Sequence, residues 1–154
     1  MIIELMEKNG ILENVKLKRN YEQFQKLLSE LRKKELPRDI IEFVNTNIND
    51  INAGTEEDKI LRKLLKQKET LIIKLLEKKA KIVPKDHYKT LWLGVGMCVF
   101  GVPIGVFLEL ITKTDMGFIA IGIPIGMAIG MLVGSGMDKK AFKEGRQLDV
   151  KIKY

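Results

Sequence analysis

Only a few residues of this chain are of a type that does chemistry, and the most prominent is an acid in an apolar stretch. Glu109 is the single charged residue in residues 91–112, and it precedes Lys113 by four positions. An acid within a membrane-spanning segment is a functional candidate by default. It could line a pore or take part in proton transfer, or it could lie at the membrane interface and pair with Lys113. Its position close to the end of the stretch favours the interface.

The single histidine and the single cysteine do not form a catalytic grouping. His87 stands beside Asp86. Although imidazole titrates near neutral pH, one histidine can form neither a histidine metal cluster nor a relay. Cys98 lies in the apolar stretch without a base near it in the sequence, and a lone cysteine forms no intramolecular disulfide. The glycines occur in apolar stretches and not in a phosphate-binding loop. We therefore expect no enzymatic activity, no metal and no cofactor.

The elements that carry these residues divide the chain into a charged part and an apolar part. Residues 1–90 hold 20 Lys and Arg and 15 Asp and Glu, whereas residues 117–137 hold no charge. A helix rises about 1.5 Å per residue and the hydrocarbon core of a bilayer is about 30 Å thick. Residues 91–112 and 117–137 are therefore each long enough to cross once. The short connection between them predicts an antiparallel transmembrane hairpin over residues 91–137.

Basic residues flank this hairpin on one side. They are Lys81, Lys85 and Lys89 before the first span, and Lys139, Lys140, Lys143, Arg146, Lys151 and Lys153 after the second. The connection between the spans offers only Lys113, which Asp115 offsets. Because cytoplasmic flanks carry an excess of Lys and Arg, we expect both termini to be cytoplasmic and the lipid bilayer to be the first partner.

Glycine recurs in both spans at the spacing of helix-packing faces. It occupies every fourth position of the second span, and in the first span glycines and Cys98 are separated by four, three and four residues. Membrane helices associate by close packing, which glycine permits. We predict that seven glycines pack helices or join copies of the chain: Gly94, Gly101, Gly105, Gly122, Gly126, Gly130 and Gly134.

Each span also carries one proline near its middle. Pro103 and Pro124 lie at similar distances from the connection, so an antiparallel hairpin would bring them to nearly the same depth. A proline inside a helix removes a backbone hydrogen bond and bends the helix. Bends at the same depth would let the two helices stay in contact through the kink.

The glycine pattern leaves two interpretations open. The glycine faces could only pack the hairpin against itself, or part of them could serve neighbouring copies and build a ring or bundle. Glycines with a four-residue period form a face that winds around a helix of 3.6 residues per turn, so one partner helix covers this face incompletely. This winding favours a homo-oligomer.

The part before the hairpin is predicted to be helical, which makes the fold class all-α. We interpret residues 1–83 as a cytoplasmic domain with helices over about 13–36, 38–52 and 55–83. Residues 1–12 could form a short helix or a strand. The helices form either a small bundle or a coiled-coil-like arrangement completed by another protomer. A heptad seam marks the first of them: Leu17, Tyr21, Phe24, Leu28 and Leu31. Residues 84–90 then read as a linker and residues 138–154 as a basic cytoplasmic tail.

The positive charge of the cytoplasmic part does not indicate nucleic acid. The chain carries a net charge of +7, but basic residues beside anionic lipid are expected at a cytoplasmic membrane face. No interleaving of basic and aromatic residues and no nucleic-acid motif accompanies them. We expect a lipid-facing or solvated surface, with an acidic protein as the alternative partner.

Residues 81–154 resemble small bacterial membrane proteins of a Bacteroidetes type that carry a glycine-zipper hairpin. The resemblance rests on residues 83–88, on the zipper over residues 122–134 and on residues 136–148. It implies the two-span topology and a location in the bacterial inner (plasma) membrane, and it implies no activity.

Together these features predict a homo-oligomeric membrane protein whose cytoplasmic helices control a pore or a membrane-perturbing assembly. The alternative is a membrane-anchored adaptor or scaffold whose cytoplasmic helices recruit a protein partner. A weaker third possibility is an accessory subunit that packs against a larger transporter.

Overall fold

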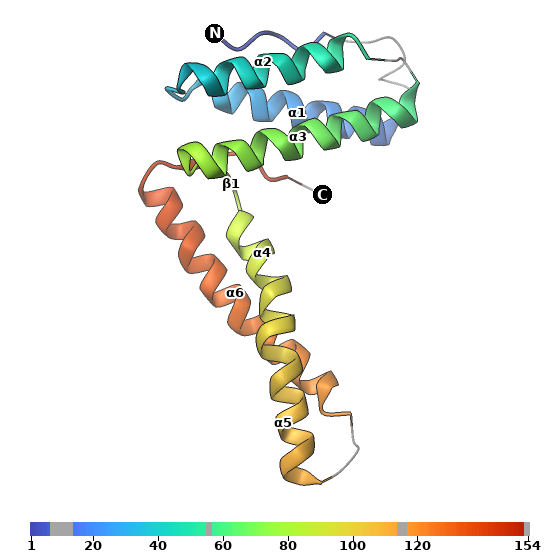
Figure 1. The fold of residues 1–154 in the computed structure, drawn as a ribbon, viewed down its shortest axis with the longest axis vertical. Coiled ribbons are helices and arrows are strands. Elements are labelled where there is room, and N and C mark those ends of the chain that lie inside the picture. The colour runs from blue at the N-terminus through green and yellow to red at the C-terminus, as the bar shows by residue number, and fades with distance from the viewer. Residues whose placement is uncertain (7–13, 55–56, 114–116, 153–154) are drawn as a thin grey trace. The chain divides into compact units, whose positions relative to one another are not determined.

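The computed structural model describes residues 1–6, 14–54, 57–113 and 117–152. Within these ranges the chain is helical apart from irregular segments and two strands of two residues each, which confirms the predicted all-α class. The elements (Figure 1) are α1 (Val15–Arg32), α2 (Arg38–Asn52), α3 (Asp58–Ala80), β1 (Val83–Pro84), α4 (His87–Gly96), the π-helical turn η1 (Met97–Gly101), α5 (Val102–Thr112), α6 (Ile119–Lys143) and β2 (Gln147–Leu148).

These elements form two compact units. Unit 1 comprises Met1–Pro84 and Leu148–Tyr154, and unit 2 comprises Lys85–Gln147. The hairpin is thus inserted into the sequence of unit 1, because the chain leaves that unit after Pro84 and re-enters it at Leu148.

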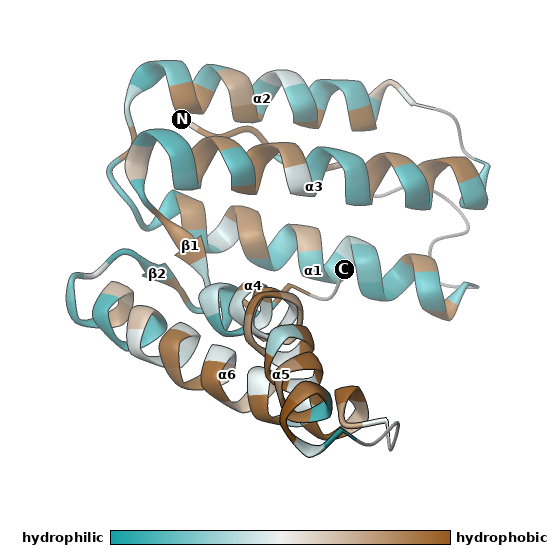
Figure 2. Cartoon of the chain, turned by 60° about the horizontal axis from the view of Figure 1, so that its bottom comes forward, coloured by the Kyte–Doolittle hydropathy of each residue, from teal (hydrophilic) through white to brown (hydrophobic). Residues whose placement is uncertain are grey.

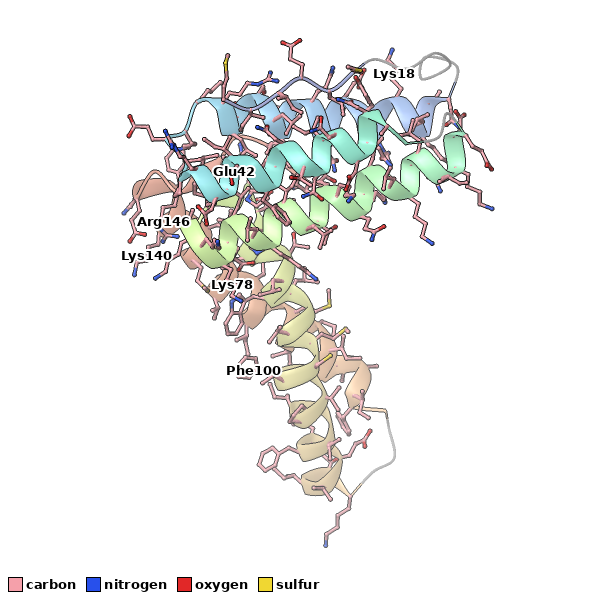
Figure 3. The ribbon with its side chains drawn as sticks, turned by 45° about the horizontal axis from the view of Figure 1, so that its top comes forward. Lys18, Glu42, Lys78, Phe100, Lys140 and Arg146 are labelled. Atoms are coloured by element: carbon pink, nitrogen blue, oxygen red, sulfur yellow. The ribbon has the colours of Figure 1, made fainter. Side chains whose placement is uncertain are left out.

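Unit 1 is built on three helices that lie side by side, as Figure 1 shows. The five residues of the predicted heptad seam on α1 are all buried. They pack with apolar residues of the other two helices, namely Ile40, Val44, Ile48 and Ile51 of α2 and Leu61, Leu65, Ile72, Ile73 and Leu76 of α3. Charged residues such as Lys18, Glu42 and Lys78 lie on the outside of these helices (Figure 3).

The helix ends of unit 1 have local causes. The side chain of Asn14 caps α1, because its Oδ1 accepts hydrogen bonds from the N–H groups of Lys16 and Leu17 at 3.1 and 3.3 Å. The helix ends at Arg32, short of the predicted residue 36. The bounds of α2 are the predicted ones. Lys81 adopts the left-handed conformation (φ 54°) and ends α3 at Ala80, whereas the predicted start at residue 55 lies outside the described residues.

Residues 138–154 do not form one separate basic tail. Their first part continues α6 as far as Lys143, and β2 pairs with β1. Beyond that point Leu148, Val150 and Ile152 are buried in the core of unit 1. Apolar residues at every second position are the pattern of a strand-like segment with one buried face, and the basic residues between them concealed this pattern.

Unit 2 is a helical hairpin. One unbroken helix from His87 to Thr112 and the antiparallel helix α6 are both long and apolar enough to cross a membrane. Apolar residues cover most of both helices in Figure 2, and Phe100 is one of the side chains that project from them in Figure 3. Because the first helix already starts at His87, the predicted linker over residues 84–90 shrinks to a short turn before it.

Candidate functional site

The four glycines of α6 form the centre of the hairpin interface. Gly122, Gly126, Gly130 and Gly134, called the glycine ladder below, are all buried. A Cβ atom added to Gly134 would lie 2.5 Å from the carbonyl oxygen of Tyr88. Cβ atoms added to the other three would collide with backbone of the first helix in the same way. The ladder therefore brings the two helix backbones into direct contact, with no room for a methyl group.

The opposite face is formed by Gly96, Gly101 and Gly105, which are also buried. A Cβ atom on Gly101 would lie 2.9 Å from Cα of Ile123. Gly94, which the sequence spacing selects, is exposed, and an added Cβ would meet nothing within 4 Å. Gly96 takes the place in the interface that was predicted for Gly94.

The π-helical turn η1 explains this shift from Gly94 to Gly96. In the turn the N–H of Val102 donates to the carbonyl of Met97, five residues back, and the next residue, Pro103, has no N–H to donate. The turn takes up one extra residue relative to an α-helix. Gly96 and Gly101, five residues apart, therefore share a face, which a spacing of three or four would not predict.

Pro124 lies opposite this turn. It sits inside α6 between Gly122 and Gly126, and Cβ atoms added to these two glycines would both meet Gly101. This register places Pro124 at the level of η1, about one helical turn from Pro103. The irregular turn is confined to the first helix, since α6 continues through Pro124 as an α-helix.

Asp138 closes the end of the hairpin that lies beyond the ladder. Its side chain is only 7% exposed, and its carboxylate accepts hydrogen bonds from the N–H groups of Tyr88 at 3.1 Å and Lys89 at 2.9 Å. A carboxylate at this place satisfies unpaired donors in the first turn of α4 and faces the positive end of its dipole. Sequence analysis missed Asp138, although an acid that directly follows an apolar span was a signal for it.

A cavity of about 410 Å³ lies beside Asp138. Its lining includes Lys85, Lys89, Lys139 and Lys143, and the benzyl group of Phe142 projects beside them with 71% of its surface exposed. The cavity lies where the apolar stretch of α6 gives way to basic residues. Ammonium groups around an apolar side chain are suited to a membrane surface that carries anionic headgroups.

Glu109 lies near the other end of the hairpin. Its side chain is half-buried on the last turns of α5, and the backbone N–H of Lys113 donates to its carbonyl at 3.0 Å. Among the described residues no ion pair joins the two side chains, and no group of three or more His, Cys, Asp and Glu is placed to hold a metal ion.

Unit 1 holds a buried acid of its own. Glu69 of α3 is 5% exposed, and both of its carboxylate oxygens accept hydrogen bonds from Nε2 of Gln23, at 2.9 and 3.1 Å. Burial raises the pKa of Glu69 to about 7, against the lowering effects of Gln23 and of the Lys66 ammonium.

Unit 1 also holds residues 1–6 through two asparagines of α2. Asn45 and Asn52 bind the backbone of this segment, and Tyr21 and Arg32 of α1 donate further hydrogen bonds to it. The sequence pattern alone assigned no role to these asparagines. Their spacing of seven residues, which places them on one face, was the available signal.

Comparison of the chain with protein-family models, with curated proteins and with solved structures found no match.

Proposed function

We propose that this protein is a membrane-anchored adaptor in which unit 2 is the anchor and unit 1 recruits a protein partner. The observation that carries the proposal is the filled glycine ladder. All four ladder glycines and their three counterparts are in contact within one hairpin. The small-residue faces that would have joined neighbouring copies are thus used inside a single chain, so an oligomer needs another surface.

The polar residues of unit 2 support the same function. Its buried acid, Asp138, holds the first turn of α4, which is a structural role. Glu109 lies near the end of its helix and not at the middle of the hairpin. A pore would need polar groups along the length of the spans. The lysines around the cavity beside Asp138 favour a cytoplasmic location of that end, and with it of both termini.

A homo-oligomeric pore or membrane-perturbing effector is the second candidate. It is favoured by two glycines on the outside of the hairpin, Gly94 and Gly136, at each of which an added Cβ would meet nothing within 4 Å. Glycines exposed to lipid in this way could receive the helices of another copy. The exposed Cys98 lies one turn from Gly94 on the same helix.

The outward glycines allow a sharper test than the ladder does. Leucine at Gly126 or Gly130 would break the hairpin itself and would remove either function. Leucine at both Gly94 and Gly136 leaves the internal interface intact and blocks only the outer face. We therefore compare the wild-type chain with the Gly94→Leu/Gly136→Leu variant by mass in mild detergent and by dye leakage from liposomes.

If the protein is an adaptor, we expect a monomer in detergent and no dye leakage from liposomes. The wild-type chain and the variant should then give the same result in both measurements. The pore predicts a wild-type oligomer that makes liposomes leak, with both properties lost in the variant, and this result would overturn the adaptor. The adaptor also predicts that proteins cross-linked to unit 1 in cells remain attached when an unrelated two-span hairpin replaces residues 85–147. Loss of all of them in that chimaera, when it is inserted in the membrane, would contradict it.

A further inference from the structure

The side chains of Asn45 and Asn52 each clamp one residue of the segment 1–6. Nδ2 of Asn45 donates to the carbonyl of Met1 at 3.1 Å, and its Oδ1 accepts from the N–H of Ile3 at 3.0 Å. The two bonds bracket Ile2. Every atom that Asn45 contacts in this way belongs to the backbone, so the contact does not depend on the side chains of the bound segment.

Asn52 repeats this arrangement three residues further along the segment. Its Nδ2 donates to the carbonyl of Glu4 at 3.2 Å, and its Oδ1 accepts from the N–H of Met6 at 2.9 Å. These bonds bracket Leu5. A primary amide offers one donor side and one acceptor side, which is what the carbonyl and N–H on either side of one extended residue require.

The spacing of the two clamps matches that of an extended chain. Asn45 and Asn52 are seven residues apart on α2, which corresponds to a rise of about 10.5 Å along a helix. Three residues of extended chain span about 10 Å. A segment that runs along α2 therefore meets the second asparagine three residues after the first.

The two bracketed residues have the most deeply buried side chains of the segment, and Ile3 between the clamps packs only partly against the core. Ile2 is 6% exposed and Leu5 is 8% exposed, whereas Met1 and Met6 at the ends of the segment are exposed. From α1, the hydroxyl of Tyr21 donates to the carbonyl of Leu5 at 3.1 Å. Backbone bonds thus supply affinity and two apolar sites supply selectivity, the division of roles seen in domains that bind extended peptides.

The site that holds the Leu5 side chain is not completely filled. A cavity of about 300 Å³ lies beside Glu4 and Leu5 and is lined on α1 by Leu28, Arg32 and two polar residues, Gln25 and Ser29. An aromatic side chain at the position of Leu5 would fill more of this space, and its ring could stack on the Arg32 guanidinium. Residues 1–6 lie in a groove between α1 and α2, and this space shows that they do not fill the groove completely. The unfilled space favours a segment of a different protein over residues 1–6 of a second copy.

We propose that the groove between α1 and α2 is a peptide-binding site that residues 1–6 occupy as a built-in competitor. Its ligand is an extended segment of a partner protein with an aliphatic residue followed, three positions later, by an aromatic or large aliphatic residue. This inference rests on the proposed adaptor function and names its recruiting surface. Because a tethered segment competes at an effective concentration on the order of millimolar, the partner binds well only when the segment is displaced.

The test measures binding of two labelled peptides to the full-length protein in detergent by fluorescence anisotropy. The peptides are acetylated and amidated Met-Ile-Ile-Glu-Leu-Met and Met-Ile-Ile-Glu-Phe-Met. We expect weak binding to the wild-type chain and at least tenfold tighter binding to the Ile2→Asp/Leu5→Asp variant, in which the segment cannot enter the groove. The peptide with phenylalanine should bind more tightly than the one with leucine.

Two further substitutions identify the site. Asn45→Ala and Asn52→Ala, added to the release variant, should each weaken peptide binding at least tenfold. Asn49→Ala is the matched control, since Asn49 is an exposed asparagine on the same helix between the two, and it should change binding by less than twofold. Equal effects of all three substitutions would overturn the proposal. So would a release variant that keeps its helical circular dichroism but binds neither peptide.

A second measurement does not need the release variant. In the wild-type chain the N–H groups of Ile3 and Met6 should exchange slowly with deuterium, and an excess of the peptide with phenylalanine should accelerate their exchange. Unchanged exchange at saturating peptide would contradict the proposal. A wild-type dimer that dissociates in the release variant would show that a second copy occupies the groove, and it would also overturn the proposal. Neither readout depends on leakage or on cellular partners, so the groove and the adaptor function can fail separately.

Discussion

Asp138 of α6 accepts a hydrogen bond from the backbone N–H of Lys89, at 2.9 Å, across 49 positions of sequence. With the companion bond from Tyr88, a single carboxylate from one helix caps the first turn of the other. α4 has no side-chain cap of its own, since Asp86 at its N-cap position adopts a left-handed conformation and makes no capping bond. The cap therefore joins the two ends of the hairpin where they enter and leave unit 2.

Removing this cap should loosen the hairpin. Asp138→Ala leaves two partly buried N–H groups without this acceptor and should lower hairpin stability by about 1–2 kcal/mol. Asp138→Asn keeps one acceptor oxygen and should lose about half as much. Trp92 is the only tryptophan and its backbone lies in the interface, so its fluorescence during SDS titration in mixed micelles reports separation of the helices. Lys139→Ala, at the exposed neighbouring position, is the control, and an equal loss there would refute the capping role.

The glycine ladder predicts a strong contrast between two glycines of one helix. A methyl group at Gly130 would collide with the carbonyl of Trp92, whereas a methyl group at Gly136 would meet nothing within 4 Å. Gly130→Ala should therefore destabilise the hairpin by roughly 2 kcal/mol or more through overpacking. Gly136→Ala should leave it unchanged or up to about 1 kcal/mol more stable, because alanine favours helix. The same fluorescence titration measures both, and similar values for the two would contradict the observed packing.

The segment after the hairpin should contribute to the stability of unit 1. Val150 is 1% exposed in its core, and the neighbouring N–H of Asp149 donates to the Glu30 carboxylate at 3.2 Å. Val150→Ala should lower the free energy of unfolding by about 1–2 kcal/mol. Val15→Ala removes the same atoms from a side chain that is 80% exposed, so it should cost less than about 0.5 kcal/mol. Thermal unfolding followed by circular dichroism compares them, and equal shifts would show that residues 148–152 are not part of the core.

Periodic patterns in the sequence were sufficient to predict the helices of both units. The heptad residues of α1 are buried because an apolar seam at that spacing has one face to place against α2 and α3. The ladder glycines of α6 follow an equally regular period. On the first span the hairpin interface contains Gly96 instead of Gly94, because the π-helical turn before Pro103 changes the number of residues per turn locally.

Contacts between distant parts of the chain could not be predicted from the sequence. Nothing near Asp138 in sequence reveals that its partners are the N–H groups of residues 88 and 89. Asn45 and Asn52 likewise read as polar helix residues until the segment 1–6 lies beside them. In both cases the side chain serves backbone groups elsewhere, and backbone groups carry no residue-specific signal.

The buried Glu69 should make unit 1 less stable as the pH rises. Its pKa lies near 7 in the folded unit, above its ordinary value of 4.5, so the folded state holds a proton that the unfolded state has already released between these two values. Stability from this group is fully present below about pH 4.5 and is lost as the pH rises through 7. One pKa unit corresponds to about 1.4 kcal/mol, so a pKa raised from 4.5 to about 7 corresponds to a loss on the order of 3 kcal/mol.

Glu69→Gln removes the titrating group and keeps an amide beside Gln23. At pH 8 the variant should unfold at a temperature higher by roughly 5 °C or more, and at pH 4.5 the difference should nearly vanish. Thermal unfolding of the full-length protein in detergent, followed by circular dichroism at both pH values, measures it. Glu42→Gln, at an exposed position of α2, is the control and should show no such pH-dependent gain. A stabilisation by Glu69→Gln that is the same at pH 4.5 and pH 8 would mean that the carboxyl does not titrate in this range. Its burial would then act only through packing.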